Sequence, residues 1–283
     1  MPYSDPKTLV STDWLAQHLK DPDLRILDAS WYLPAANRDP KAEYDAAHIP
    51  GARFFDIDEI ADANSDLPHM VPSPEKFISR MRAMGIGDGH QVVVYDGAGV
   101  MSAARVWWLF HLMGKTDTAV LDGGLPKWVA AGGETEDMPP ITRDRHMTVS
   151  RNAALIKDVT QVAAAAKLKD ALILDARSAG RFKGDEPEPR AGLRSGHIPG
   201  SKNLPFQQLL NEDGTMKPVA QLKEIMEDLG VEMKTPVITS CGSGVTAAII
   251  NLALERIGHK NHSLYDGSWA EWGMYNDLKV DQG

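Results

Sequence analysis

The sequence predicts an α/β protein of two tandem domains, each a mostly parallel β-sheet flanked by helices. Two observations carry this prediction: short apolar runs alternate with amphipathic stretches, and the second half of the chain repeats the first. The β-branched runs Val92–Tyr95 and Val237–Ser240 each follow an amphipathic stretch, which is the βαβ order of a parallel sheet. With 283 residues, either half is long enough to bury a core.

The repeat consists of four sequence blocks that recur in the same order. Matching blocks are separated by 144 to 149 residues, which indicates a duplicated domain. The first members of the pairs are Ile26–Ala29, His48–Gly51, Val92–Val100 and Leu121–Gly124 with Trp128, and the second are Ile173–Ala176, His197–Gly200, Val237–Val245 and Tyr265–Ser268 with Trp272.

Proline and glycine mark the ends of the expected helices. Ser73-Pro74 precedes a helix at Glu75–Met84, and Pro218 precedes one at Val219–Leu229; Gly85 and Gly230 follow them. Residues 134–152 have no apolar period and contain Pro139-Pro140, so they predict a linker. We therefore expect a first domain over 1–137, a linker over 138–153 and a second domain over 154–283.

Composition narrows the class of protein. A formal net charge of −9 disfavours binding to nucleic acid or to an anionic membrane. The single cysteine excludes an internal disulfide and suits a reducing compartment, so we expect a cytoplasmic protein. Residues 1–6 have neither a basic nor an apolar signal-peptide region, and no apolar run approaches the roughly 20 residues of a membrane span.

That cysteine, Cys241, lies between an expected buried strand at 237–239 and an expected helix that starts at Ala247 and ends before Gly258. A glycine-rich turn from strand to helix directs several backbone N–H groups at one point, and the helix N-terminus adds partial positive charge. We expect Cys241 to be a nucleophilic thiolate there, although a lone cysteine is often only a small buried hydrophobe. In the first half Asp96 takes its place, so we expect that half to be catalytically inactive.

The loop Cys241–Thr246, within a tandem repeat that has two His-Ile-Pro-Gly motifs, resembles the two-domain rhodanese superfamily. Within it the resemblance is to the 3-mercaptopyruvate sulfurtransferase family, and it runs from about Leu9 to Trp272. The segments that carry it, besides the loop, are Leu27–Pro34, Phe54–Asp58, His69-Met70, Arg105–Trp108, Gly180–Phe182 and Glu186–Arg190.

The resemblance implies two rhodanese-like domains and the transfer of sulfane sulfur from 3-mercaptopyruvate through a persulfide on Cys241, with release of pyruvate. The acceptor would be thioredoxin, a small thiol or cyanide. The resemblance also implies that Arg181 and Arg190 bind the substrate's carboxylate and carbonyl groups, because guanidinium groups bind carboxylates in a bidentate way. The loop residues Gly242, Gly244, Val245 and Thr246 would complete the substrate site.

By the same resemblance, Ser243, His69 and Asp58 form a hydrogen-bond relay that moves protons. A solvent-exposed His69 is the alternative, and spacing alone does not decide between Asp58 and Asp56. The histidines His48 and His197 occur in both halves, including the one expected to be inactive. We therefore interpret them as structural.

Three other functions remain open from the sequence. Thiosulfate sulfurtransferase activity is the first, but the thiosulfate branch has cationic side chains in the loop, whereas here Gly242 and Ser243 are neutral. Cysteine-dependent phosphatases and arsenate reductases need an arginine where this chain has Ala247. A non-enzymatic persulfide carrier would not need the two arginines. We expect no cofactor and no metal, since the chain has no cysteine cluster and no His-Glu-x-x-His arrangement.

Overall fold

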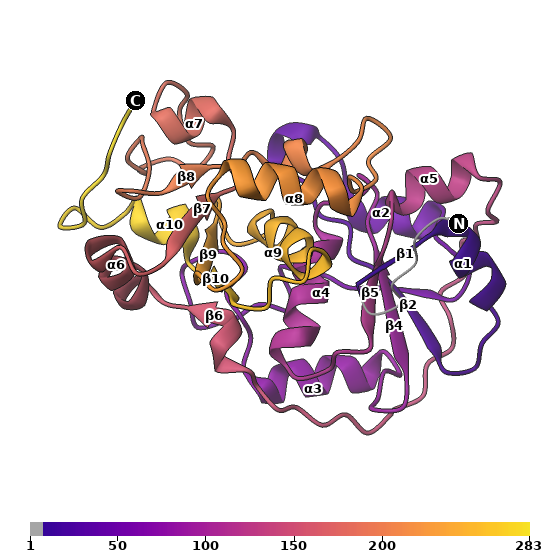
Figure 1. Ribbon diagram of the computed structural model, residues 1–283. Helices are drawn as coiled ribbons and strands as arrows, with labels where there is room; N and C mark the ends of the chain where they lie inside the picture. Colours follow the sequence, from indigo (N-terminus) through magenta and orange to yellow (C-terminus); the bar gives the residue numbers. More distant parts are fainter. Residues whose placement is uncertain (1–7) are drawn as a thin grey trace. The chain divides into compact units, whose positions relative to one another are not determined.

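The computed structural model describes residues 8–283 (Figure 1). The six residues that we interpret as lacking a secretory signal lie outside this range. Residues 8–283 form two compact units, which do not follow a single boundary along the chain. The first unit comprises the described residues up to Ala63, Pro72–Asn152 and Glu212–Met216; the second comprises Asn64–Val71, Ala153–Asn211 and Lys217–Gly283.

The first unit is built on a five-stranded sheet in the order β1-β5-β4-β2-β3, and all its strand pairs are parallel. Its strands are β1 (Leu9–Val10), β2 (Leu24–Asp28), β3 (Ala52–Phe54), β4 (Gln91–Tyr95) and β5 (Thr118–Leu121). Its helices are α1 (Thr12–His18), α2 (Pro40–Ala46), α3 (Pro74–Ala83), α4 (Ala103–Leu112) and α5 (Gly124–Ala130), with a 3₁₀ turn at Pro34–Ala36.

The second unit repeats this arrangement in the order β6-β10-β9-β7-β8, again with parallel pairs only. Its strands are β6 (Ile156–Lys157), β7 (Leu172–Asp175), β8 (Lys202–Asn203), β9 (Val237–Ser240) and β10 (His262–Tyr265). Its helices are α6 (Val159–Leu168), α7 (Ala179–Lys183), α8 (Val219–Asp228), α9 (Ala247–Arg256) and α10 (Ser268–Trp272), with 3₁₀ turns at Ala153–Leu155 and Phe206–Leu209. The predicted α/β class, with a parallel sheet in each half, is confirmed.

Local sequence sets the ends of the helices. The Ser73 hydroxyl accepts a hydrogen bond from the Lys76 N–H group at the start of α3 (3.2 Å), and Pro74 is the first helical residue. Gly85 follows α3 and Gly230 follows α8, both with positive φ. The expected helices therefore occur within one or two residues of their predicted bounds.

The central strand of each sheet leads into a buried helix. All four residues of β9 are buried, as are the first eight residues of α9. In a parallel sheet the loops after the carboxyl ends of the strands carry the functional groups. The loop between β9 and α9 is such a place, and it contains Cys241. Four tryptophans of the repeat blocks and motifs lie in the core, each at most 2% exposed: Trp107, Trp108, Trp128 and Trp272.

Residues 141–152 of the expected linker contain neither helix nor strand. They are nevertheless fixed to the first unit: the N–H groups of Ser150 and Asn152 donate to the carbonyls of Met113 and Leu112 (3.0 and 2.7 Å). The domain boundaries near residues 137 and 154 stay predictions. Within residues 8–283, no helix has both the length and the apolar character needed to cross a bilayer.

Candidate active site

The loop that follows β9 places Cys241 at the start of α9. Cys241 is 2% exposed. Gly244 has a φ of +76°, a left-handed conformation that suits glycine. Thr246, the N-cap residue of α9, makes no side-chain hydrogen bond to the helix. The first N–H groups of a helix lack partners within the helix, and they favour a negative group at this end.

The first unit shows what such a loop binds. The buried Asp96 carboxylate accepts hydrogen bonds from the backbone N–H groups of Ala98, Met101 and Ala103, at 2.9, 2.8 and 2.9 Å. Asp96 corresponds to Cys241 in the repeat, and Gly99, with φ +118°, corresponds to Gly244. In the first unit, therefore, an internal carboxylate occupies the ring of N–H groups.

The other face of the first unit's loop is covered by its own side chains. A Cβ atom on Gly97 would lie 2.2 Å from the Tyr32 hydroxyl oxygen, and the Arg38 guanidinium donates to the Gly97 carbonyl at 3.3 Å. Gly242 is the counterpart of Gly97. A Cβ atom on Gly242 would instead lie 3.0 Å from Nη2 of Arg181 and 3.8 Å from Nη1 of Arg190. The two predicted substrate arginines thus converge beside Cys241.

The backbone around Cys241 is held by the turn before α10. The Cys241 N–H group donates to the Ser268 hydroxyl oxygen at 3.2 Å, and that hydroxyl donates to the Tyr265 carbonyl at 2.8 Å. The N–H group of Trp269 donates to the Cys241 carbonyl at 2.9 Å. Ser268 has a φ of +50°, which is costly for a residue other than glycine. The residue that fixes the backbone of Cys241 is therefore itself strained.

Two members of the predicted relay meet. Nδ1 of His69 lies 3.0 Å from Oγ of Ser243, and Nη2 of Arg190 donates to the same oxygen at 3.4 Å. Both His69 and Ser243 are buried, so the alternative of a solvent-exposed His69 is wrong. His69 also has a positive φ of +61°, a further strained residue at the site.

Asp58 belongs to the first unit, and its Oδ2 atom accepts a hydrogen bond from Nε1 of Trp31 at 3.1 Å. The neighbouring Asp56 caps its own turn: its Oδ1 accepts from the N–H groups of Asp58 and Glu59, each at 3.0 Å. Support of His69 by Asp58 stays a prediction.

The two repeated histidines are structural, as predicted. Nδ1 of His48 pairs with the Tyr44 carbonyl at 2.6 Å, and Nδ1 of His197 pairs with the Phe182 carbonyl at 2.9 Å. Both rings are buried. Within residues 8–283, no group of three or more His, Cys, Asp or Glu side chains is arranged to hold a metal ion.

A family model described as a rhodanese-like domain matches this chain twice, over residues 11–131 and 158–275. The chain belongs to the rhodanese-like family. Each match covers one copy of the sequence repeat. The resemblance seen in the sequence is therefore confirmed at the level of the family.

Individual relatives cover nearly the whole chain. The chain is 42% identical to thiosulfate/3-mercaptopyruvate sulfurtransferase 1, mitochondrial, of Arabidopsis thaliana, over 98% of this chain and 79% of the relative. It is 41% identical to the 3-mercaptopyruvate sulfurtransferase of Escherichia coli strain K12, over 96% of this chain and 97% of the relative. The crystal structure of SseA from Escherichia coli, a 3-mercaptopyruvate sulfotransferase, superposes with a TM-score of 0.84 at 39% identity and covers 93% of this chain and 99% of its own.

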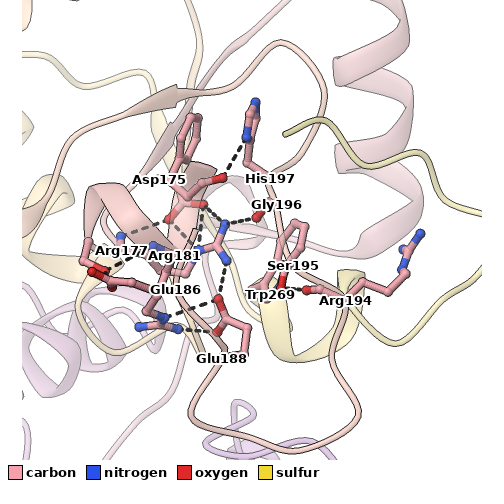
Figure 2. Close-up of polar contacts among 12 residues, drawn as sticks. Asp175, Arg177, Arg181, Glu186, Glu188, Arg194, Ser195, Gly196, His197 and Trp269 are labelled. Carbon is pink, nitrogen blue, oxygen red and sulfur yellow. Dashed lines mark hydrogen bonds and ion pairs between the residues drawn. The ribbon is translucent and has the colours of Figure 1, made fainter. Parts of the chain in front are cut away.

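Two features of this rhodanese-like site were not predicted from the sequence. In the sequence, Ser268 is recognised only as part of a repeat block. Its counterpart in the first half is Gly124, and this difference between serine and glycine is the signal that could have marked Ser268 as special. Glu188 was quoted only as part of a motif, yet it accepts two hydrogen bonds from Arg181 (Figure 2). No pattern in the sequence pairs these two side chains.

The carboxylate of Asp96 generates a stability prediction. Asp96→Ala would leave three N–H groups without their acceptor, and each unsatisfied buried group costs about 1–3 kcal/mol. We expect the first rhodanese-like unit to lose about 3 kcal/mol or more, measured as a lower urea midpoint by tryptophan fluorescence. Asp45→Ala, which removes only an exposed ion pair with Lys41, is the control and should change little. An unchanged midpoint for Asp96→Ala would contradict this account of the loop.

Proposed function

We propose that this protein is a sulfurtransferase that moves sulfane sulfur from 3-mercaptopyruvate to an acceptor through a persulfide on Cys241 and releases pyruvate. One observation carries the proposal: the guanidinium groups of Arg181 and Arg190 approach the same face of Gly242, next to Cys241. Two guanidinium groups suit a 2-oxo acid, which presents a carboxylate and a carbonyl oxygen. The names of the Arabidopsis and Escherichia coli relatives support the same substrate.

In the first stage, the Cys241 thiolate attacks the sulfur of bound 3-mercaptopyruvate. A sulfur–sulfur bond forms and the carbon–sulfur bond of the substrate breaks, so that the electron pair leaves with carbon as the enolate of pyruvate. Arg181 and Arg190 balance the charge on the carboxylate and on the enolate oxygen. The N–H groups of the loop hold the thiolate first and the persulfide afterwards. Gly242 places no side chain between Cys241 and the two arginines, and Gly244 supplies the left-handed residue of the loop.

Protons must move during this stage. The substrate thiol loses a proton, and the enolate gains one to become pyruvate. Ser243 and His69, which lie 3.0 Å apart, form a path that moves protons in both directions. We include Asp58 as the carboxylate that would orient His69. Val245 and Thr246 complete the loop on which the substrate rests.

In the second stage, an acceptor removes the outer sulfur and restores Cys241. A thiol, such as thioredoxin or a small thiol, or cyanide has the nucleophilicity that this step requires. Two separate half-reactions give ping-pong kinetics. We also propose a cytoplasmic location, on the ground that the nucleophilic thiol has to stay reduced.

Thiosulfate is the alternative donor, and the Arabidopsis relative carries both donors in its name. Thiosulfate is a compact dianion, whereas Gly242 and Ser243 add no positive charge to the loop. We therefore expect a higher kcat/KM for 3-mercaptopyruvate than for thiosulfate.

The first unit would be catalytically inactive in this scheme. Asp96 stands at the position of the nucleophile and occupies the N–H groups itself, and a carboxylate cannot form a persulfide. This division agrees with the proposed domains: an inactive rhodanese-like domain over residues 1–137 and a catalytic one over residues 154–283.

The proposal predicts a covalent intermediate on one atom. After addition of 3-mercaptopyruvate, intact-mass spectrometry should show the wild-type chain heavier by one sulfur atom, and Cys241→Ser should show no gain. Thiosulfate at the same concentration should load less sulfur. Equal loading of Cys241→Ser, or none on the wild type, would contradict the proposal.

Replacement of either substrate arginine by lysine should weaken the binding of 3-mercaptopyruvate. Arg181→Lys and Arg190→Lys each replace a two-pronged contact with the substrate by a point charge. A charge-assisted hydrogen bond contributes about 1.5–3 kcal/mol, so KM for 3-mercaptopyruvate should rise roughly 10- to 100-fold. Arg82→Lys, at an exposed site with only a long ion pair to Asp144, is the matched control. An unchanged KM in both variants would remove these arginines from the substrate site.

A side chain added at Gly242 should clash with Arg181. In Gly242→Ala, the new methyl group would meet Nη2 of Arg181 at 3.0 Å, a contact that displaces the guanidinium. We expect KM for 3-mercaptopyruvate to rise about 3- to 10-fold, which corresponds to about 1 kcal/mol. Gly89→Ala is the control, because a Cβ atom there meets nothing within 4 Å. Equal KM values for the two variants would show that the arginine has room to move.

A further inference from the structure

A chain of buried ion pairs lies behind Arg181 (Figure 2). The Glu188 side chain is only 2% exposed and faces two arginines. It accepts hydrogen bonds from Nε and Nη2 of Arg181, at 3.2 and 2.5 Å, and from Nη1 of Arg177, at 2.7 Å. Glu188 therefore joins an arginine of the candidate site to one that is fully buried.

Arg177 is fixed from several sides. It donates to both carboxylate oxygens of Asp175 and to the carbonyl of Gly196, at distances from 2.7 to 3.1 Å. Its guanidinium carbon lies 4.2 Å from the ring centroid of Trp269, and the backbone N–H group of Trp269 donates to the Cys241 carbonyl. Burial by itself would lower the pKa of Arg177, but the carboxylates of Asp175 and Glu188 outweigh it and raise the pKa. Arg177 is a permanent cation with one orientation.

The contact with Glu188 divides the donors of Arg181 into two groups. Nε–H and one hydrogen of Nη2 point to Glu188. Within residues 8–283, the other three N–H groups, two on Nη1 and one on Nη2, make no hydrogen bond. One N–H group of Nη1 and the remaining one of Nη2 form the end edge of the guanidinium, and Nη2 is the atom that approaches Gly242. Glu188 thus leaves the end edge of Arg181 available on the side of Cys241.

The repeat supplies an internal comparison. Asp28 of the first half corresponds to Asp175, and Ser30 corresponds to Arg177. Ser30 donates to Asp28 as Arg177 donates to Asp175, but the Ser30 hydroxyl then accepts from the Gly97 N–H group at 2.9 Å. In the first half the arginine and glutamate nearest this network, Arg38 and Glu43, pair with each other at an exposed site, with side chains 40% and 39% exposed. The extension through a buried arginine and a buried glutamate is found in the half that contains the cysteine.

We propose that Glu188, itself held by Arg177, is a positioning residue that fixes which edge of Arg181 is presented to the carboxylate of the substrate. This inference rests on the proposed function. An arginine side chain loses rotamer entropy when a ligand orders it, and Glu188 orders Arg181 before the substrate arrives. The charges of Asp175 and Glu188 balance those of Arg177 and Arg181, so the order is obtained without an unpaired buried charge.

The direction in which KM changes when Glu188 is neutralised distinguishes a positioning role from a simple counter-charge role. If Glu188 acted only as a counter-charge that competes with the substrate for Arg181, its neutralisation would strengthen substrate binding and lower KM. A positioning residue has the opposite effect, because a reoriented Arg181 loses its two-pronged contact with the carboxylate.

The test compares Glu188→Gln with Glu186→Gln, a neighbouring glutamate whose carboxylate accepts a hydrogen bond from the Ser178 hydroxyl at 2.9 Å. We expect Glu188→Gln to raise KM for 3-mercaptopyruvate about 5- to 20-fold while kcat stays within about twofold. Glu186→Gln should change both values less than about twofold. A KM for Glu188→Gln that is unchanged or lower than that of the wild type would overturn the proposal.

A double variant tests whether Glu188 acts through Arg181. The KM of Arg181→Lys/Glu188→Gln should equal that of Arg181→Lys, since the residue to be positioned is already gone. Multiplication of the two single effects would overturn the proposal. Reaction of Cys241 with iodoacetamide should proceed at the wild-type rate in Glu188→Gln, because alkylation does not use Arg181. If Glu188→Gln fails to fold, Glu188→Asp keeps the charge one methylene shorter and should raise KM in the same direction.

Sulfur loading of the wild type and the KM of Glu188→Gln distinguish a failure of the proposed function from a failure of the role of Glu188. If the wild-type chain gains no sulfur from 3-mercaptopyruvate, the proposed function fails before any variant is compared. If the wild type gains sulfur and Glu188→Gln keeps its KM, only the positioning role of Glu188 is wrong.

Discussion

The whole architecture of the site follows from a ring of backbone N–H groups that needs an anion. Such a ring forms wherever a central parallel strand turns through glycine into a buried helix, because the first N–H groups of that helix lack internal partners. The first unit satisfies the ring with the carboxylate of Asp96. In the second unit the same position holds Cys241, whose own N–H and carbonyl groups are taken up by Ser268 and Trp269. These two contacts fix the backbone of Cys241, and the proposed function assigns the ring to its sulfur.

A loop built from neutral residues cannot also meet the charge of a substrate. The positive charge therefore comes from outside the loop, on α7 and on the segment that follows it, where Arg181 and Arg190 lie. Both reach the loop at Gly242, the residue beside Cys241, which has no side chain to block them. Under the proposed function this arrangement separates two tasks: backbone donors would stabilise the sulfur anion, and the two arginine side chains would bind the carboxylate. Substrate choice would then depend on the arginines, which need support of their own.

The strands, the helices and the repeat were predictable from the sequence. The contacts between distant residues were not, and the reason is physical. Strand β9, helix α9 and the repeat follow from local periodicity and from glycine and proline, which act over a few residues. The assignment of Arg181, Arg190, Ser243 and His69 came from the resemblance rather than from spacing. By contrast, the contact between Arg177 and Glu188 and the hydrogen bond from Cys241 to Ser268 join residues 11 and 27 positions apart through loops. The membership of residues 64–71 in the second unit, which brings His69 to Ser243, has no local signal either.

The two halves also show how one scaffold is divided between stability and chemistry. In the first half, the polar groups around the loop satisfy one another: Asp96 fills the ring, Ser30 bridges Asp28 to the loop, and Arg38 covers Gly97. In the second half, Ser268 carries backbone strain, and Arg177 and Glu188 carry buried charge. Buried ion pairs seldom stabilise a fold more than apolar residues of the same size would. The buried pairs of Arg177 with Asp175 and Glu188 are therefore better explained by the orientation that we propose they impose on Arg181 than by any gain in stability.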